Sequence, residues 1–158
     1  MLDDLFAQLR TATAPAEIEA LQNGIWQLWL SSGDAALDKD LEFSLRVLHA
    51  KEYTQAISLF TRLIRLKPDF AEAWNKRATA YYLRGDFKAS LADIAETLRR
   101  EPRHFGALWG QAGILRQLGD YRRALHVLDR LAALCAHFSG LREQQRTLRE
   151  LLEDKASE

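Results

Sequence analysis

Apolar side chains recur every three or four residues along most of the chain, which is the spacing of amphipathic helices and not of strands. Between residues 70 and 100, one apolar stripe consists of Phe70, Trp74, Ala78 and Tyr81. A second stripe consists of Phe87, Leu91, Ile94 and Leu98. Gly85 suits the left-handed conformation that ends a helix, and Asp86 offers a carboxylate to the first free amides of the next helix. This stretch therefore predicts a hairpin of two helices.

The hairpin pattern repeats with a period of 34 residues. Aromatic side chains keep this spacing at Tyr53, Phe87 and Tyr121, just after the acidic residues Glu52, Asp86 and Asp120. Small residues keep it at Ala56, Ser90 and Ala124. Two apolar columns share the register, namely Ile57, Leu91 and Leu125 and then Phe60, Ile94 and Leu128. Such a period predicts a stack of similar helical hairpins, with a small residue where the two helices of each hairpin cross.

The middle copy resembles the tetratricopeptide repeat, whose 34-residue pattern runs tryptophan, small residue, tyrosine, alanine, aromatic, proline. The residues that carry the resemblance are Trp74, Ala78, Tyr81, Gly85, Asp86, Phe87, Ser90, Ile94 and Pro102. The resemblance implies three units, at residues 37–70, 71–104 and 105–138. The third unit has Leu108 for the tryptophan and Ala136 for the proline, and the first has Asp40 for the tryptophan. Lys51 replaces the glycine of the first unit, where a left-handed backbone would cost about 1 kcal/mol.

The flanking segments predict helical caps, because a terminal repeat has no neighbour to cover its apolar side. Residues 139–158 form a C-terminal capping helix with a short tail, and its apolar side consists of Leu141, Leu148, Leu151 and Leu152. Residues 1–36 form an N-terminal cap, a degenerate repeat with a short first helix over 2–11 and a second helix that starts at Pro15. In that second helix we expect Trp26 and Trp29 to lie in the core. The expected fold class is all-α, a right-handed α-solenoid of tetratricopeptide helical hairpins with N- and C-terminal capping helices, about nine helices in all.

Charge is balanced overall but uneven along the chain. Residues 1–50 hold 3 basic and 8 acidic side chains, 3 − 8 = −5, and residues 51–138 hold 15 and 9, 15 − 9 = +6. The whole chain has 22 of each sign. A zero net charge argues against a nucleic-acid partner. The basic cluster at residues 99–104 has two interpretations, a phosphate site or a solvated turn between helices, and we favour the turn.

No arrangement of residues predicts catalysis or a cofactor. The four histidines are His49, His104, His126 and His137, and no two of them have the spacing of a metal-ligand pair on one helix. The single cysteine, Cys135, excludes an internal disulfide, and neither a nucleophile elbow nor a carboxylate pair occurs. We therefore expect no enzyme, no cofactor and no metal.

The N-terminal segment predicts neither a secretory signal nor a membrane span, because it is acidic and lacks an uninterrupted apolar core. We expect a cytoplasmic protein without membrane insertion. The resemblance to small stand-alone bacterial tetratricopeptide proteins, many of which carry an export signal, leaves a periplasmic location open if such a signal was trimmed.

In tetratricopeptide arrays, the first helix of each unit lines a concave groove, and the resemblance assigns candidate groove residues by position. The partner-binding residues that we predict are Asn75, Lys76, Thr79, Tyr82, Gly106, Trp109, Gly110, Gly113 and Arg116. The glycines would leave backbone that a partner can approach closely, with Trp109 as a wall. In the alternative interpretation, Trp109 is covered by the chain's own C-terminal segment or by neighbouring helices, and the glycines let helices pack closely.

The function predicted from this pattern is a non-catalytic module for protein interaction, an adaptor or scaffold that binds a peptide or helix of a partner protein. Domains of this family that clamp the C-terminal carboxylate of chaperones use lysine, asparagine and arginine at fixed positions. Here those positions hold Leu41, Leu45, Lys76, Gly106 and Gly110, so we expect no clamp of that kind. The alternative function is a homo-oligomer that assembles through the acidic N-terminal segment.

Overall fold

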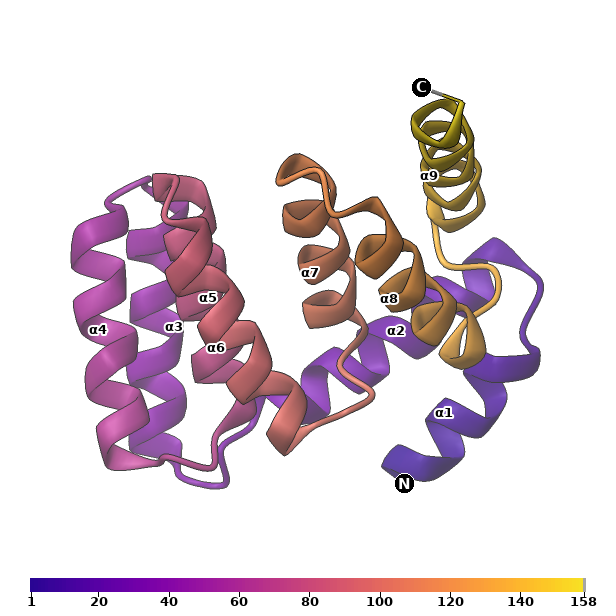
Figure 1. The fold of residues 1–158 in the computed structure, drawn as a ribbon. Coiled ribbons are helices and arrows are strands. Elements are labelled where there is room, and N and C mark those ends of the chain that lie inside the picture. The colour runs from indigo at the N-terminus through magenta and orange to yellow at the C-terminus, as the bar shows by residue number, and fades with distance from the viewer. Residues whose placement is uncertain (158) are drawn as a thin grey trace. The chain divides into compact units, whose positions relative to one another are not determined.

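The computed structural model describes residues 1–157 of the 158-residue chain, and within this range the secondary structure is entirely helical (Figure 1). The helices in this range are α1 (Leu2–Thr11), α2 (Pro15–Leu30), α3 (Ala35–His49), α4 (Tyr53–Leu66), α5 (Ala71–Arg84), α6 (Phe87–Arg100), α7 (Phe105–Gln117), α8 (Tyr121–Leu134) and α9 (Leu141–Ala156). They pack as sequential pairs, which confirms the predicted all-α fold class. Over residues 1–157 no helix is both long and apolar enough to cross a bilayer.

Packing divides the chain into two compact units. One unit combines residues 1–28 with residues 108–158, and the other consists of residues 29–107. The cuts fall inside α2 and α7, so the compact units do not coincide with the 34-residue repeats. The repeat boundaries themselves stay a prediction.

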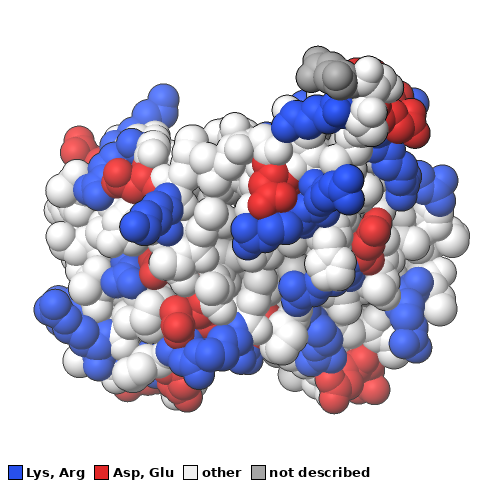
Figure 2. Space-filling model, in the orientation of Figure 1, with Lys and Arg blue, Asp and Glu red and all other residues white. Residues whose placement is uncertain are grey.

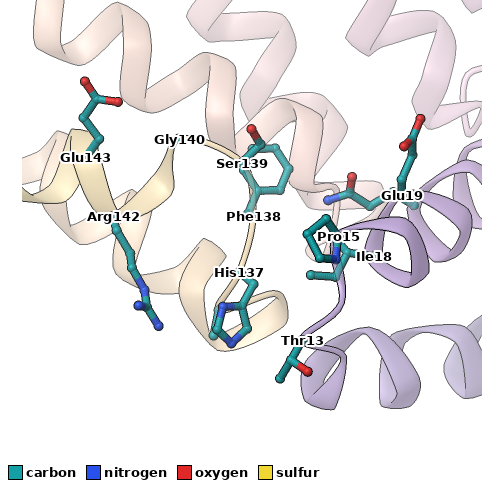
Figure 3. Close-up of a pocket in the computed structure, with 12 residues that line it drawn as sticks. Thr13, Pro15, Ile18, Glu19, His137, Phe138, Ser139, Gly140, Arg142 and Glu143 are labelled. Carbon is teal, nitrogen blue, oxygen red and sulfur yellow. The ribbon is translucent and has the colours of Figure 1, made fainter.

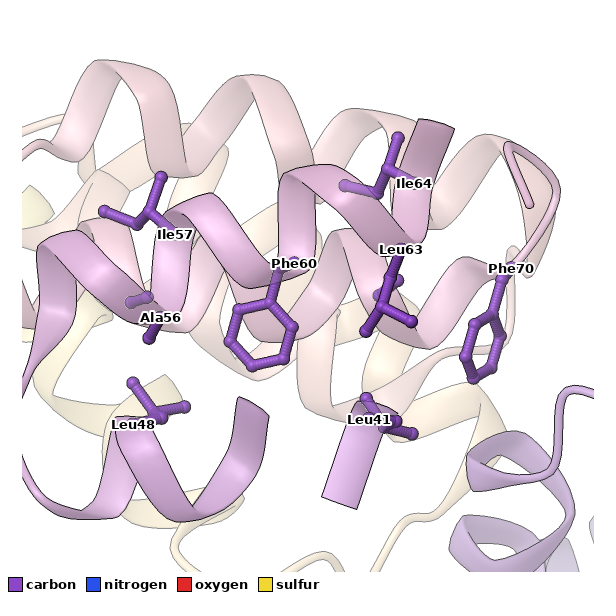
Figure 4. Packing of buried hydrophobic residues seen from close by; sticks show 10 residues of the cluster. Leu41, Leu48, Ala56, Ile57, Phe60, Leu63, Ile64 and Phe70 are labelled. Carbon is purple, nitrogen blue, oxygen red and sulfur yellow. The ribbon is translucent and has the colours of Figure 1, made fainter. Parts of the chain in front are cut away.

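Residues 29–107 contain the hairpins α3–α4 and α5–α6, with a shared apolar core. Helix α4 packs against both α3 and α5. In Figure 4, Ala56, Phe60 and Leu63 of α4 point toward Leu41 and Leu48 of α3. All five side chains are buried. The heptad-like spacing of the α4 residues places them on one face, which is the face that the hydrophobic effect drives against its neighbours.

The crossing point of each hairpin holds the small residue that the period predicted. Ala56, Ser90 and Ala124 are all buried, with 0%, 1% and 0% of their surface exposed. The Ser90 hydroxyl donates a hydrogen bond to the Ala78 carbonyl at 2.8 Å, which satisfies its buried oxygen. A larger side chain here would push the two helices of the hairpin apart.

The turns inside the hairpins share a left-handed residue. Gly85 and Gly119 have φ angles of 91° and 79°, as predicted for a residue that ends a helix. Lys51 adopts the same conformation with φ 64°, so the first turn has the left-handed geometry of the other two although it lacks the glycine. The capping role expected for Asp86 is wrong, because its carboxylate accepts a hydrogen bond from Arg84 Nε at 2.6 Å and caps no amide. The equivalent Asp120 does accept from the Arg123 amide.

A buried polar network links α5 to the start of α7 within residues 29–107. The Glu72 carboxylate and the His104 ring are fully buried, with Glu72 Oε2 2.8 Å from His104 Nε2. His104 Nδ1 accepts the Ala107 amide at 3.1 Å, so Nε2 must carry the hydrogen that is donated to Glu72. The ring also stacks on Trp29, with centroids 4.2 Å apart. His104 therefore caps α7, donates a hydrogen bond to a buried carboxylate and supports an aromatic stack.

Trp74 lies at the edge of the core and not inside it. Its indole Nε1 donates to the Pro68 carbonyl at 3.0 Å. The Arg77 and Arg100 guanidinium groups lie 5.1 Å and 4.5 Å from its ring centroid, within the range of cation–π attraction. Arg77 is itself bound by both carboxylate oxygens of Asp93. Trp74 thus contacts a partly buried network of charged side chains as well as part of the core.

In the other unit, α8 contacts both α9 and α1. Leu141 and Leu148 of α9 are buried, as the capping-helix prediction requires, and Leu151 and Leu152 are partly buried. Phe6 and Leu9 form the buried face of α1. The contact between α1 and α8 brings the beginning of the chain against its third hairpin, a pairing that the sequence pattern did not predict.

We expect Lys51→Gly to raise the free energy of unfolding by up to about 1 kcal/mol, because glycine adopts the left-handed conformation without the Cβ penalty. The matched control is Lys39→Gly on an exposed position of α3, which should lower it by about 1 kcal/mol. Urea unfolding followed by circular dichroism measures both. Equal losses in the two variants would show that the Lys51 backbone carries no strain.

We expect His104→Phe to lower the free energy of unfolding by about 3 kcal/mol, because it keeps a ring beside Trp29 but removes the hydrogen-bond donor to the buried Glu72 Oε2 and the acceptor of the Ala107 amide. Adding Glu72→Leu should recover most of this loss, since no buried charge then remains at the pair. The same urea titration tests the prediction. If His104→Phe alone lowered the free energy of unfolding by less than 1 kcal/mol, the proposal that stability depends on the pair of Glu72 and His104 would be contradicted.

Candidate functional site

The nine predicted partner-binding residues fall into both compact units. Asn75, Lys76, Thr79, Tyr82 and Gly106 belong to residues 29–107. Trp109, Gly110, Gly113 and Arg116 belong to the unit of residues 1–28 and 108–158. Helix α5 carries Asn75, Lys76, Thr79 and Tyr82, and α7 carries the other five residues.

On α5, the predicted residues surround Glu72. Asn75 is buried, and its amide nitrogen donates to Glu72 Oε1 at 3.2 Å. Lys76 Nζ lies 3.4 Å from the same oxygen. The Thr79 hydroxyl donates to the Asn75 carbonyl. Asn75 therefore faces a buried carboxylate, which the groove assignment did not anticipate.

Tyr82 is the exposed member of the α5 set, with 37% of its surface accessible. Its ring lies beside Phe87 at a centroid distance of 5.6 Å. This contact holds the phenol near the turn between α5 and α6. Leu83, the next residue, is also exposed.

On α7, the predicted residues Trp109, Gly113 and Arg116 follow one another at spacings of four and three, so they lie along one side of the helix. Trp109 is partly buried, whereas Gly113 and Arg116 are exposed. A Cβ added at Gly113 would meet no atom within 4 Å. Gly113 is therefore not needed for helices to pack closely, in contrast to the alternative interpretation of the glycines.

The connection between α8 and α9 supports Trp109. The rings of Trp109 and Phe138 have centroids 5.2 Å apart and an interplanar angle of 44°. Gly140 has φ 77°, and a Cβ there would lie 3.3 Å from the Trp109 ring. This is the contact with the chain's own C-terminal segment that the second interpretation of Trp109 expected.

Arg116 is held by α9. Its Nη1 donates to Gln144 Oε1 at 2.7 Å. We call the set of Trp109, Gly113, Arg116, Phe138 and Gln144 the Trp109 surface. The sequence did not predict Phe138 and Gln144 as part of this surface. The groove positions of the repeat lie only on the first helix of each unit, and both residues follow the last helix of the third unit.

A cavity of about 690 Å³ adjoins the Trp109 surface at Phe138, and Gly140 also lines it. As Figure 3 shows, the connection before α9 forms one side of it, and Pro15 and Ile18 at the start of α2 lie on the other. Its wall is apolar at Pro15, Ile18 and Phe138. The charged lining residues carry both signs and include Glu19, Arg142 and Glu143.

The basic cluster at residues 99–104 is occupied by contacts within the protein. Arg99 and Arg100 both pair with the Glu96 carboxylate, which holds the pKa of Glu96 below its usual range. Arg103 pairs with Glu101, and His104 is buried. The cluster is thus neither a bare phosphate site nor a simple solvated turn. Figure 2 likewise shows basic and acidic side chains interspersed over the visible face.

The structure groups no side chains in a metal-binding arrangement: within residues 1–157, no three His, Cys, Asp or Glu side chains are placed to hold an ion. Cys135 is buried at the end of α8. Burial raises the pKa of the Cys135 thiol and keeps it in the unreactive protonated form.

Comparison with known proteins supports the repeat assignment. A family model described as tetratricopeptide repeat matches residues 47–95 and 76–137. A TPR repeat-containing protein of Rhizobium etli is 34% identical over 151 residues, which cover 96% of this chain and 74% of that protein.

Two solved structures share the fold. The Sgt2 TPR domain from Aspergillus fumigatus has a TM-score of 0.72 at 18% identity, covering 79% of this chain and 84% of that one. The Yersinia enterocolitica type III secretion chaperone SycD, in complex with a peptide of the translocator YopD, has a TM-score of 0.65 at 15% identity, covering 77% and 92%. Together with the 34-residue period and the helical hairpins, the match of the family model and the Rhizobium relative show that this chain belongs to the tetratricopeptide repeat family.

Proposed function

We propose that the protein is a non-catalytic interaction module, an adaptor or scaffold that holds a peptide or helix of a partner protein on the first helices of its repeats. The residues proposed for this contact are Asn75, Lys76, Thr79, Tyr82, Gly106, Trp109, Gly110, Gly113 and Arg116. Within this set, Trp109, Gly113 and Arg116 supply the main contact, and Asn75 acts through the Glu72 carboxylate to which it donates a hydrogen bond.

The observation that carries the proposal is the bare backbone at Gly113. A glycine inside a helix costs about 1 kcal/mol relative to alanine. Gly113 is exposed in α7, and a Cβ added there would meet no neighbouring atom within 4 Å. Because packing gives no reason for this glycine, close approach of another molecule is the physical role that we assign to it.

Trp109 gives this surface a fixed aromatic contact. Phe138 and Gly140 hold the indole from one side, so binding would cost little of its rotational freedom. Tryptophan and arginine are the residues that most often dominate the free energy of binding at interfaces. A rigid Trp109 and an exposed Arg116 on the same helix fit this role.

The comparisons support the proposal at the level of the family. SycD, which shares the fold, is seen in complex with a peptide of another protein. At 15% identity this similarity concerns the fold alone, so the partner of the present chain must be found by experiment.

The experiment compares partner capture by the wild-type protein and by Gly113→Gln. We expect Gly113→Gln to raise the free energy of unfolding by about 1 kcal/mol, since glutamine favours the helix and the space is open. The same variant should lose the bound partner, because its side chain fills the path of the partner backbone. Capture from native lysate, with mass spectrometry and urea unfolding, measures both effects.

Ala133→Gln on an exposed position of α8 is the matched control, since it adds the same side chain elsewhere on the unit. It should capture the same proteins as the wild type. If Gly113→Gln retained every partner at wild-type levels, Gly113 would not lie at the binding surface. If Gly113→Gln were less stable than the wild type, the interpretation that there is open space for a side chain at Gly113 would be wrong.

A further inference from the structure

We infer that the Trp109 surface recognises an extended peptide segment in which a carboxylate side chain lies three residues from a large apolar side chain. This inference rests on the proposed function, because it names the chemistry of the partner at the same site. Three features carry it: the charge of Arg116, the gap at Gly113 and the distance from Trp109 to Arg116.

Arg116 differs from most arginines of the second and third repeats, because its partner is a neutral amide and not a carboxylate. Six arginines in residues 71–138 pair with carboxylates, namely Arg77, Arg84, Arg99, Arg100, Arg103 and Arg123. The Arg116 guanidinium instead bonds the neutral amide of Gln144, and none of the acidic groups within residues 1–157 forms an ion pair with it. Gln144 orients the guanidinium without neutralising it, so its charge remains available to a carboxylate of a partner.

The gap at Gly113 fits an extended chain. A single missing side chain leaves an opening about one helical turn long, roughly 5 Å. Extended backbones lie about 5 Å apart when they pair, whereas a helix with its side chains is about 10 Å across. An extended segment can therefore approach the α7 backbone at Gly113, and a helix would be held off by Trp109 and Arg116 on either side.

The distance along α7 sets the spacing in the ligand. Arg116 lies seven positions after Trp109, which corresponds to about 10 Å along the helix axis. In a polyproline II segment, residues i and i+3 lie on one side about 9 Å apart. One such segment can place an apolar side chain against Trp109 and Phe138 while its carboxylate meets Arg116.

The test uses synthetic eight-residue peptides of serine, proline and glycine with one Phe and one Asp. The two residues are placed three, one or six positions apart, in both orders, and Asn replaces Asp in a matched series. Binding is followed by nuclear magnetic resonance of the ¹⁵N-labelled full-length protein, through the Gly113 amide and the Trp109 indole. We expect the three-position Asp peptide of one order to bind about fivefold more tightly than its Asn counterpart.

Arg116→Gln should abolish the preference for Asp over Asn while leaving residual binding of the Phe side chain. Arg122→Gln, an exposed arginine of α8, is the matched control and should keep the preference. The preference should also weaken as salt is raised, because the contact is electrostatic.

Equal binding of the Asp and Asn peptides to the wild-type protein would overturn the inference. A preference for Asp over Asn that survives in Arg116→Gln would also overturn it, and so would a failure of every peptide to bind. These results differ from failure of the proposed function. If the peptides fail but Gly113→Gln still loses its captured partner, the surface binds a partner of another chemistry. If the captured partner is unaffected by Gly113→Gln, the proposed function fails as well.

Discussion

The close crossing of two helices in each hairpin is the constraint on which the rest of the structure depends. Ala56, Ser90 and Ala124 leave no room for anything between the helices, and all three are buried. A hairpin held this closely has two apolar sides, and it can bury the second only against another helix. This need explains why α4 contacts α5 as well as α3, and why α8 contacts α9.

The sequence predicted those features that depend on local spacing. The 34-residue period gave the hairpins, and Gly85 and Gly119 take the left-handed turns that their positions required. Side-chain partners were harder to predict, because they depend on which residues meet in space. Asp86 has an arginine two residues away that competes for its carboxylate, so it does not act as a cap.

The buried pair of Glu72 and His104 illustrates the same limit more strongly. The two residues are 32 positions apart in the sequence. Each is a polar residue type that is usually found on an exposed turn or helix surface. Only folding shows that the imidazole satisfies the carboxylate on one nitrogen and the first turn of α7 on the other. Of the candidate site, the α7 residues were predictable from repeat positions. Phe138 and Gln144 were not, because no repeat rule describes the segment beyond the third hairpin.

The position of Cys135 makes its thiol a reporter of local opening in the connection between α8 and α9. The thiol is buried at the end of α8, three residues before the Phe138 ring that supports Trp109. A reagent can reach it only when this part of the chain opens. The rate at which an alkylating reagent modifies Cys135 in the native protein therefore reports how often this segment opens. A ligand that holds Phe138 against Trp109 would lower this alkylation rate without contacting the sulfur.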